Sequence, residues 1–183
     1  MMTKQPIVTD WIAYMKSNMS DLGAKLGLDD AAVDRLLALE MDVALQPNFD
    51  PKALLKEKIS SEFGSDIAQK YEFYQYAQEA SSKTSSILPA FTEANVPLSK
   101  EQSEQLSDLY ATAFRDWRPV AQTPDGQILS MKSVLEQMSQ MDRYIITAAN
   151  AFLTEQQVNV LQQTQARALK SKQAALGLYY GST

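Results

Sequence analysis

The chain has 183 residues, of which 45% are hydrophobic and 21% charged, so an ordinary globular protein with a hydrophobic core is expected. Its formal net charge of −5 at pH 7 argues against nucleic-acid binding, which normally requires a basic surface. The sequence contains neither cysteine nor histidine, which excludes disulfides, thiolate or imidazole catalysis, and zinc sites built from these side chains.

Apolar residues recur at helical spacing along almost the whole chain, which predicts an all-α bundle of about seven or eight amphipathic helices without a sheet. The first apolar seam covers residues 12–26 and stops at Gly27. Asp29 or Asp30 can cap a second helix, which Pro47 ends.

The segment NFDPKALLKEKISSEFG predicts a third helix, with Asp50 as its N-cap and Pro51 as its first residue. Gly64 is expected to close this helix in the left-handed conformation, and the next helix follows directly. Pro89 lies inside that next periodic stretch, which predicts a break or kink near Ser86–Leu88.

In the second half, an apolar face ends near Pro119, and the sequence TPDG (residues 123–126) is typical of a type I turn. A longer seam, Met131–Phe152, keeps close to a 3.5-residue period, which favours antiparallel or coiled-coil-like packing. A last helix is expected from Glu155 toward Ala175, followed by a fraying tail. We expect one helical domain over residues 1–183, with residues 9–95 and 98–176 as two packed sub-bundles.

Two short segments, LSKEQ and LTEQQ, each stand at the start of a predicted helix. In both, a hydroxyl residue is followed three positions later by glutamine, which predicts a capping box that satisfies two backbone N–H groups. The motif residues are Leu98, Ser99, Gln102, Leu153, Thr154 and Gln157. A hydrophobic staple between Leu153 and Val158 is also possible at the second site, whereas Ser103 prevents one at the first.

LSKEQ and LTEQQ resemble the paired LTxxQ motifs of the Spy/CpxP-type family of bacterial periplasmic stress proteins. The resemblance implies a helical, usually dimeric protein that binds exposed client segments without ATP. The first copy departs from the family pattern, because Ser99 stands where the family has threonine. The basic character of the family is absent from this chain, and its metal-responsive branch cannot apply without histidine.

The aromatic residues Tyr71, Phe73, Tyr74 and Tyr76 offer a possible protein-binding surface, since tyrosine combines large contact area with a polar end. Their helical spacing favours the alternative, in which Tyr71 and Tyr74 belong to the core. Some apolar surface should still be exposed, because four neighbouring aromatic residues cannot all face one way.

Methionine and acidic residues each allow a functional and a structural interpretation. The methionines could form an adaptable binding groove, although ordinary core filling is the simpler reading of their seam positions. They are Met15, Met19, Met41, Met131, Met138 and Met141. The acidic groups could bind a cation or act in acid–base chemistry, but helix capping and solvated faces explain them better. They are Asp29, Asp30, Asp34, Glu101 and Glu104.

These observations predict a non-enzymatic helical binding protein, chaperone-like or stress-related, of the bacterial envelope, with no cofactor and no metal. Its partner is expected to be a protein, with a homodimer possible. Two other hypotheses stay open: an interaction module with one specific partner, and a helical enzyme or small-ligand carrier. No apolar run reaches the roughly 20 residues of a membrane span, and the first residues lack the apolar part of a signal peptide. A periplasmic location with the signal or anchor removed is favoured over a cytoplasmic one.

Overall fold

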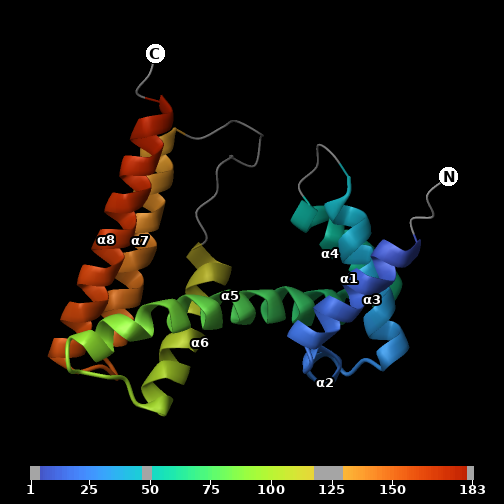
Figure 1. Cartoon of the computed structure of the whole chain (residues 1–183), viewed down its shortest axis with the longest axis horizontal. Coiled ribbons are helices and arrows are strands. Elements are labelled where there is room, and N and C mark those ends of the chain that lie inside the picture. The colour runs from blue at the N-terminus through green and yellow to red at the C-terminus, as the bar shows by residue number, and fades with distance from the viewer. Residues whose placement is uncertain (1–4, 47–50, 118–129, 181–183) are drawn as a thin grey trace. The chain divides into compact units, whose positions relative to one another are not determined.

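Helix follows helix along the chain (Figure 1). The structure, a computed structural model, describes the backbone of residues 5–46, 51–117 and 130–180, and the side chains of residues 10–46, 51–117, 130 and 132–174. Eight α-helices and no strand lie within these backbone ranges, which confirms the all-α prediction. They are α1 Gln5–Asn18, α2 Leu22–Leu26, α3 Asp30–Ala44, α4 Pro51–Phe63, α5 Ser65–Glu93, α6 Lys100–Trp117, α7 Met131–Ala149 and α8 Glu155–Tyr180. Over the same ranges, no helix combines the length and apolar character that spanning a bilayer requires.

The chain divides into two compact units, Met1–Gln75 and Tyr76–Thr183. The boundary lies inside α5, which begins in the first unit and ends in the second. This division differs from the expected sub-bundles, which were separated in the loop after residue 95. The reason is that the first part of α5 buries its apolar side chains with the N-terminal helices, whereas the last part buries them with α6, α7 and α8.

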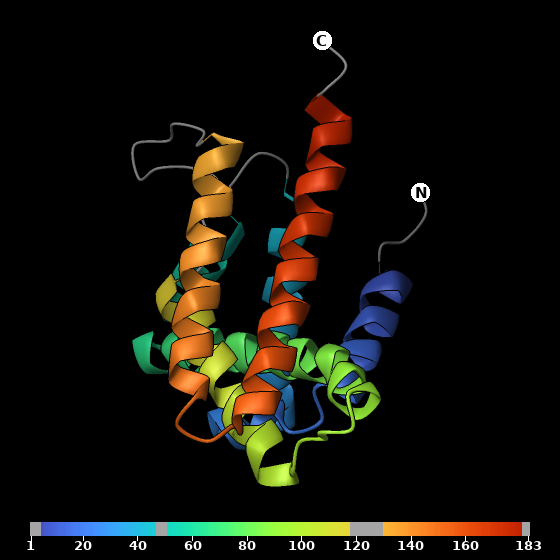
Figure 2. The ribbon, with the colours of Figure 1, turned by 90° about the vertical axis from the view of Figure 1, so that its left-hand side faces the viewer.

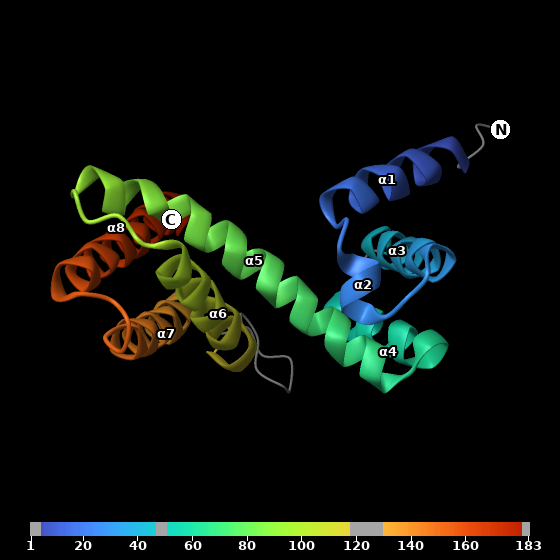
Figure 3. The same ribbon diagram turned by 90° about the horizontal axis from the view of Figure 1, so that it is seen from below.

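In the first unit, α3 packs against α1, α2 and α4 (Figure 3). The predicted first seam proves to be two helices, because the chain turns at Met19–Asp21 between α1 and α2. The turn places Leu22 and Leu26 in the core, and the Tyr74 hydroxyl donates a 2.7 Å hydrogen bond to the Asp21 carboxylate. The core cluster comprises Leu22, Leu26, Val33, Leu36, Leu37, Val43, Leu55, Ile59, Ala68, Tyr71 and Tyr74.

The predicted ends of these helices are found wherever they fall on described residues. Asp29 caps α3, since its carboxylate accepts a 2.7 Å hydrogen bond from the amide of Ala32. Pro51 is the first residue of α4, and Gly64 has the expected left-handed backbone, with φ at 92°. The expected N-cap at Asp50, the stops at Pro47 and Pro119, and the turn at residues 123–126 lie outside the described residues.

In the second unit, α7 packs against both α6 and α8. Helices α7 and α8 run antiparallel, side by side (Figure 2). The core-facing side of α7 presents Met141, Ile145 and Ala149, so the predicted seam is the buried face of this helix. The helix ends at Ala149, three residues before the seam was expected to end at Phe152. Helix α8 continues to Tyr180, so its final residues extend the helix where a fraying tail was expected.

The expected break before Pro89 is absent, because α5 continues through this residue to Glu93. Proline cannot donate the hydrogen bond that the carbonyl four residues earlier would accept. Both Pro89 and Ser85 are exposed, so water can reach the carbonyl that lacks its partner. Ile87 and Phe91, on either side of Pro89, are 4% and 0% exposed in the core of the second unit. Their burial holds the helix together against the local preference of proline.

Replacing Pro89 with alanine should therefore raise the free energy of unfolding by about 1–3 kcal/mol, since the missing hydrogen bond is restored on an exposed helix surface. Urea denaturation followed by circular dichroism measures the change. Ser81→Ala, at another exposed position of α5, is the matched control and should change stability by about 0.5 kcal/mol or less. An unchanged or lowered stability of Pro89→Ala would contradict this account of the helix.

Candidate functional site: the paired helix caps

Both predicted capping boxes are formed. At the start of α6, the amide of Gln102 donates to Ser99 Oγ at 3.1 Å, and the amide of Ser99 donates to Gln102 Oε1 at 3.0 Å. At the start of α8, the amide of Gln157 donates to Thr154 Oγ1 at 3.3 Å, and the amide of Thr154 donates to Gln157 Oε1 at 3.0 Å. Each helix thus satisfies two of the backbone N–H groups that its first turn leaves free.

The two boxes are also bonded directly to each other, which the sequence did not predict. Gln102 Nε2 donates to Gln157 Oε1 at 3.0 Å, and Gln157 Nε2 donates to Gln102 Oε1 at 3.1 Å. The two amide groups therefore form a reciprocal pair between residues that are 55 positions apart in the chain. Since a capping box needs only its own helix, this second set of bonds gives the two motifs a common role in the packing of the second unit.

Each glutamine also binds the backbone that leads into the opposite helix. Gln102 Nε2 donates to the carbonyl of Phe152 at 3.0 Å, and Gln157 Nε2 donates to the carbonyl of Pro97 at 3.1 Å. Each carbonyl belongs to the residue two positions before the opposite cap, so the arrangement is close to twofold symmetric. Each side-chain amide donates twice and accepts twice, which uses all of its hydrogen-bonding capacity. We call Ser99, Gln102, Thr154 and Gln157, together with the carbonyls of Pro97 and Phe152, the paired-cap network.

The leucines of the two motifs anchor the network to the core. Leu153 is 8% exposed, and Leu98 packs, half-buried, against the same hydrophobic cluster. Val158 is buried in that cluster together with Leu153, as a hydrophobic staple requires. At the first motif the Ser103 hydroxyl instead donates to the carbonyl of Ser99 at 2.9 Å. At the fourth helical position, Val158 of α8 therefore makes an apolar contact, whereas Ser103 of α6 makes a hydrogen bond.

Burial makes the network energetically important. Gln157 is only 5% exposed, so removal of the opposite glutamine would leave each of its amide atoms with one hydrogen bond in place of two, and with little access to water. A hydrogen bond inside a protein contributes about 1 kcal/mol net, and an unsatisfied buried polar atom costs about 1–3 kcal/mol. The network contains no ionisable side chain. Its arrangement thus suits it to position helices and not to transfer protons.

The four aromatic residues singled out in α5 do not form one surface. Tyr71 and Tyr74 are 2% and 6% exposed and belong to the core of the first unit. The Tyr71 hydroxyl donates to the Glu40 carboxylate at 2.7 Å, and burial, followed by the charge of Glu40, raises the pKa of Tyr71. Phe73 is 50% exposed. The possible binding surface therefore loses its two buried members and keeps Phe73 as its exposed aromatic residue.

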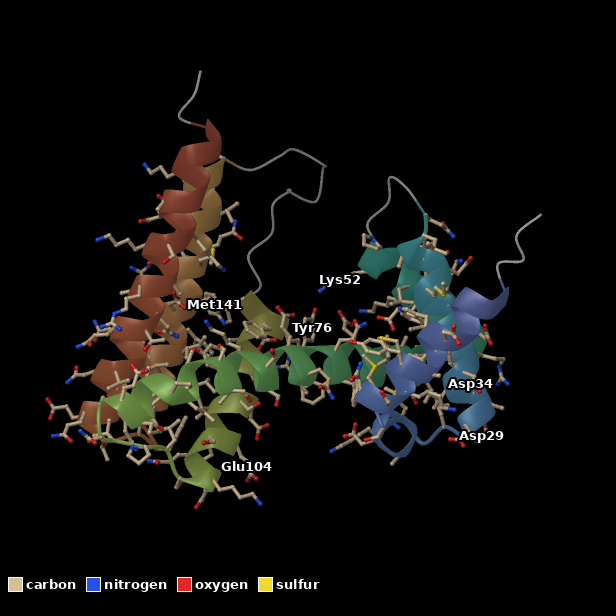
Figure 4. The ribbon with its side chains drawn as sticks, in the orientation of Figure 1. Asp29, Asp34, Lys52, Tyr76, Glu104 and Met141 are labelled. Carbon is tan, nitrogen blue, oxygen red and sulfur yellow. The ribbon has the colours of Figure 1, made fainter. Side chains whose placement is uncertain are left out.

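Tyr76 is half-buried on the part of α5 that belongs to the second unit (Figure 4). Among the methionines with described side chains, Met141 of α7 is buried, at 8% exposed, and the others are half-buried. Met131 has no described side chain. Core filling, the simpler of the two readings, is therefore part of the role of Met141.

Three of the five acidic residues that were considered as ligands have a structural partner in the described part of the chain. Asp29 caps α3, and Asp34 forms a 2.8 Å salt bridge with Lys16 (Figure 4). Glu104 pairs with Lys100 at 3.7 Å on the exposed surface of α6. Over the described residues, no three acidic side chains are grouped as a metal site would require.

In the comparisons with known proteins, the chain matches no family model, no curated protein and no solved structure. The residues of the two short motifs nevertheless lie together in one hydrogen-bonded network.

The network predicts an unusual response to exchanging glutamine for glutamate. An isolated capping box accepts either residue. In Gln157→Glu, however, a carboxylate oxygen would replace Nε2 and face the carbonyl of Pro97 and Gln102 Oε1, two atoms that cannot donate. We expect a loss of about 2–4 kcal/mol in the free energy of unfolding at neutral pH. The matched control is Gln156→Glu, an adjacent exposed position, which should change stability by about 0.5 kcal/mol or less.

The loss in Gln157→Glu should shrink as the pH falls. The two facing oxygens raise the pKa of the introduced carboxyl in the folded chain above its value in the unfolded chain. The folded protein then binds the proton more tightly, so stability is highest below the unfolded pKa and declines as the pH rises through the folded pKa. Urea denaturation at a series of pH values tests this. A loss that stays constant with pH, or equals that of Gln156→Glu, would show that the network does not need a donor at Nε2.

Proposed function

We propose that this chain is a non-enzymatic helical binding protein that holds exposed segments of other proteins without ATP, as a chaperone-like or stress-related factor of the bacterial envelope. The observation that carries the proposal is the paired-cap network. It joins LSKEQ and LTEQQ into one structural element, and a pair of such motifs is what the chain shares with the Spy/CpxP-type proteins.

The network also supports a binding role on physical grounds. It connects the first turns of α6 and α8 through four side-chain hydrogen bonds, so the two helices keep a defined relation at that end. A site that lies on rigid elements needs little reorganisation when a partner binds. The absence of histidine and cysteine from the sequence removes the commonest catalytic groups, which favours binding over chemistry.

Charge indicates which partners such a protein would favour. The net charge of −5 would attract basic segments, leave neutral segments unaffected and repel acidic ones at low ionic strength. This is a departure from the basic character of the Spy/CpxP-type proteins. The proposed clients are therefore unfolded segments without an excess of acidic residues.

The purified chain should suppress the aggregation of a chemically unfolded, neutral or basic model protein when present in equimolar amounts without ATP. Light scattering after dilution from denaturant measures the effect, with an unrelated acidic globular protein at the same concentration as control. Suppression should be weaker for an acidic client and should recover when salt screens the repulsion. Equal scattering with and without the chain would refute the proposal.

A second candidate is an interaction module for one specific protein. It is favoured by the end of α8, where residues 170–174 are exposed and so accessible to a partner. A pull-down with the full chain distinguishes the two candidates. Recovery of one protein in stoichiometric amount would favour the module, and recovery of many unfolded proteins would favour the chaperone-like role.

A further inference from the structure

The second unit contains a groove of about 370 Å³ that is lined by residues of α5, α6, α7 and α8. Its apolar wall consists of Tyr110 and Phe114 of α6, Met138 and Met141 of α7, and Leu169 of α8. Met141 is labelled on α7 in Figure 4. Thioether side chains adapt to different shapes, so a wall of this kind accepts several apolar groups. The volume is near the lower end of the range for ligand sites, which leaves room for a short segment and not for a folded surface.

The polar side of the groove carries balanced charge. Glu79 and Asp142 contribute two acidic groups, and Lys83 and Lys172 two basic groups. Among the described residues, neither Asp142 nor Lys83 forms a salt bridge. Burial raises the pKa of Asp142 and lowers the pKa of Lys83, so the surroundings disfavour charge at both groups. A ligand that brought a further net charge would be disfavoured in the same way.

One buried acceptor of the groove lacks a donor. Gln165 is 4% exposed, and its Nε2 donates to the Tyr110 hydroxyl at 3.3 Å. Its Oε1 has no hydrogen-bond partner among the described residues. A buried acceptor without a partner is destabilising, and a ligand N–H that reached it would remove that cost.

We propose that this groove binds an uncharged peptide segment of a client protein, which places one aliphatic side chain against the methionine and aromatic wall. The backbone N–H of that residue donates to Gln165 Oε1, and its carbonyl accepts from the Lys83 ammonium. A peptide group is neutral and carries one donor and one acceptor, which matches the balanced charge and the two polar atoms. This inference rests on the proposed function and adds the site and the class of segment.

The test is an NMR titration of the full chain labelled with ¹³C-methyl methionine. The resonances of Met138 and Met141 are assigned with the variants Met138→Leu and Met141→Leu. The probe is the capped peptide acetyl-Gly-Ala-Leu-Ala-Gly-amide, and in two charged versions both alanines are replaced by aspartate or by lysine. The neutral peptide should shift these two methyl resonances and leave Met15 and Met19 of the first unit unchanged. Both charged peptides should bind about tenfold more weakly.

The role of Gln165 is tested separately. Gln165→Leu should weaken binding of the neutral peptide about tenfold, whereas Gln162→Leu, at an exposed position of the same helix, should not change it. On the unaltered chain, a peptide methylated at the leucine nitrogen cannot donate and should show the same loss. If Gln165→Leu and the methylated peptide leave affinity unchanged, the assigned hydrogen bond is refuted.

Other outcomes decide between this inference and the proposed function. No shift of Met138 and Met141 at millimolar peptide, or equal shifts with decanol, would overturn the peptide site. If aggregation is suppressed while these methyl groups stay unchanged, clients bind elsewhere and only the groove assignment fails. If the methyl groups shift as expected but aggregation is not suppressed, the peptide site stands and the chaperone-like role fails.

Discussion

The second unit depends on the reciprocal amide pair between Gln102 and Gln157. Each glutamine completes the cap of its own helix and, with its remaining donors, binds the backbone before the other helix. Because every polar atom of both amides is used, neither cap can be changed without affecting the other. The leucines before the two caps, Leu98 and Leu153, pack against the hydrophobic core. Leu106 and Leu161, one helical turn after Gln102 and Gln157, are fully buried in it.

Much of the fold could be predicted because the helical spacing of apolar residues and the residues that begin or end a helix are local properties of the sequence. The capping by Asp29, the left-handed Gly64 and the boxes at Ser99 and Thr154 each depend on residues within a few positions of one another. The continuity of α5 through Pro89 could not be predicted in this way, since it depends on the burial of side chains by distant helices. Tertiary packing there outweighed a local preference.

The candidate site was predictable only in part for a related reason. The two capping boxes are visible in the sequence, whereas their mutual bonds join residues 55 positions apart and require the folded second unit. The one hint was the repetition itself, because both motifs share a leucine, a hydroxyl residue and a glutamine at equal spacing. The groove gave no such hint, since Gln165 and Asp142 look like ordinary surface residues of amphipathic helices until the bundle closes around them.

The junction between the helix starts is held entirely by uncharged groups. Amides and hydroxyls do not gain or lose protons over the range in which proteins work, and dissolved ions screen them far less than they screen ion pairs. Acidification or a rise in ionic strength would therefore leave these bonds in place while surface salt bridges elsewhere on the chain weaken. The relation between the starts of α6 and α8 is therefore less sensitive to pH and salt than any contact that an ion pair maintains.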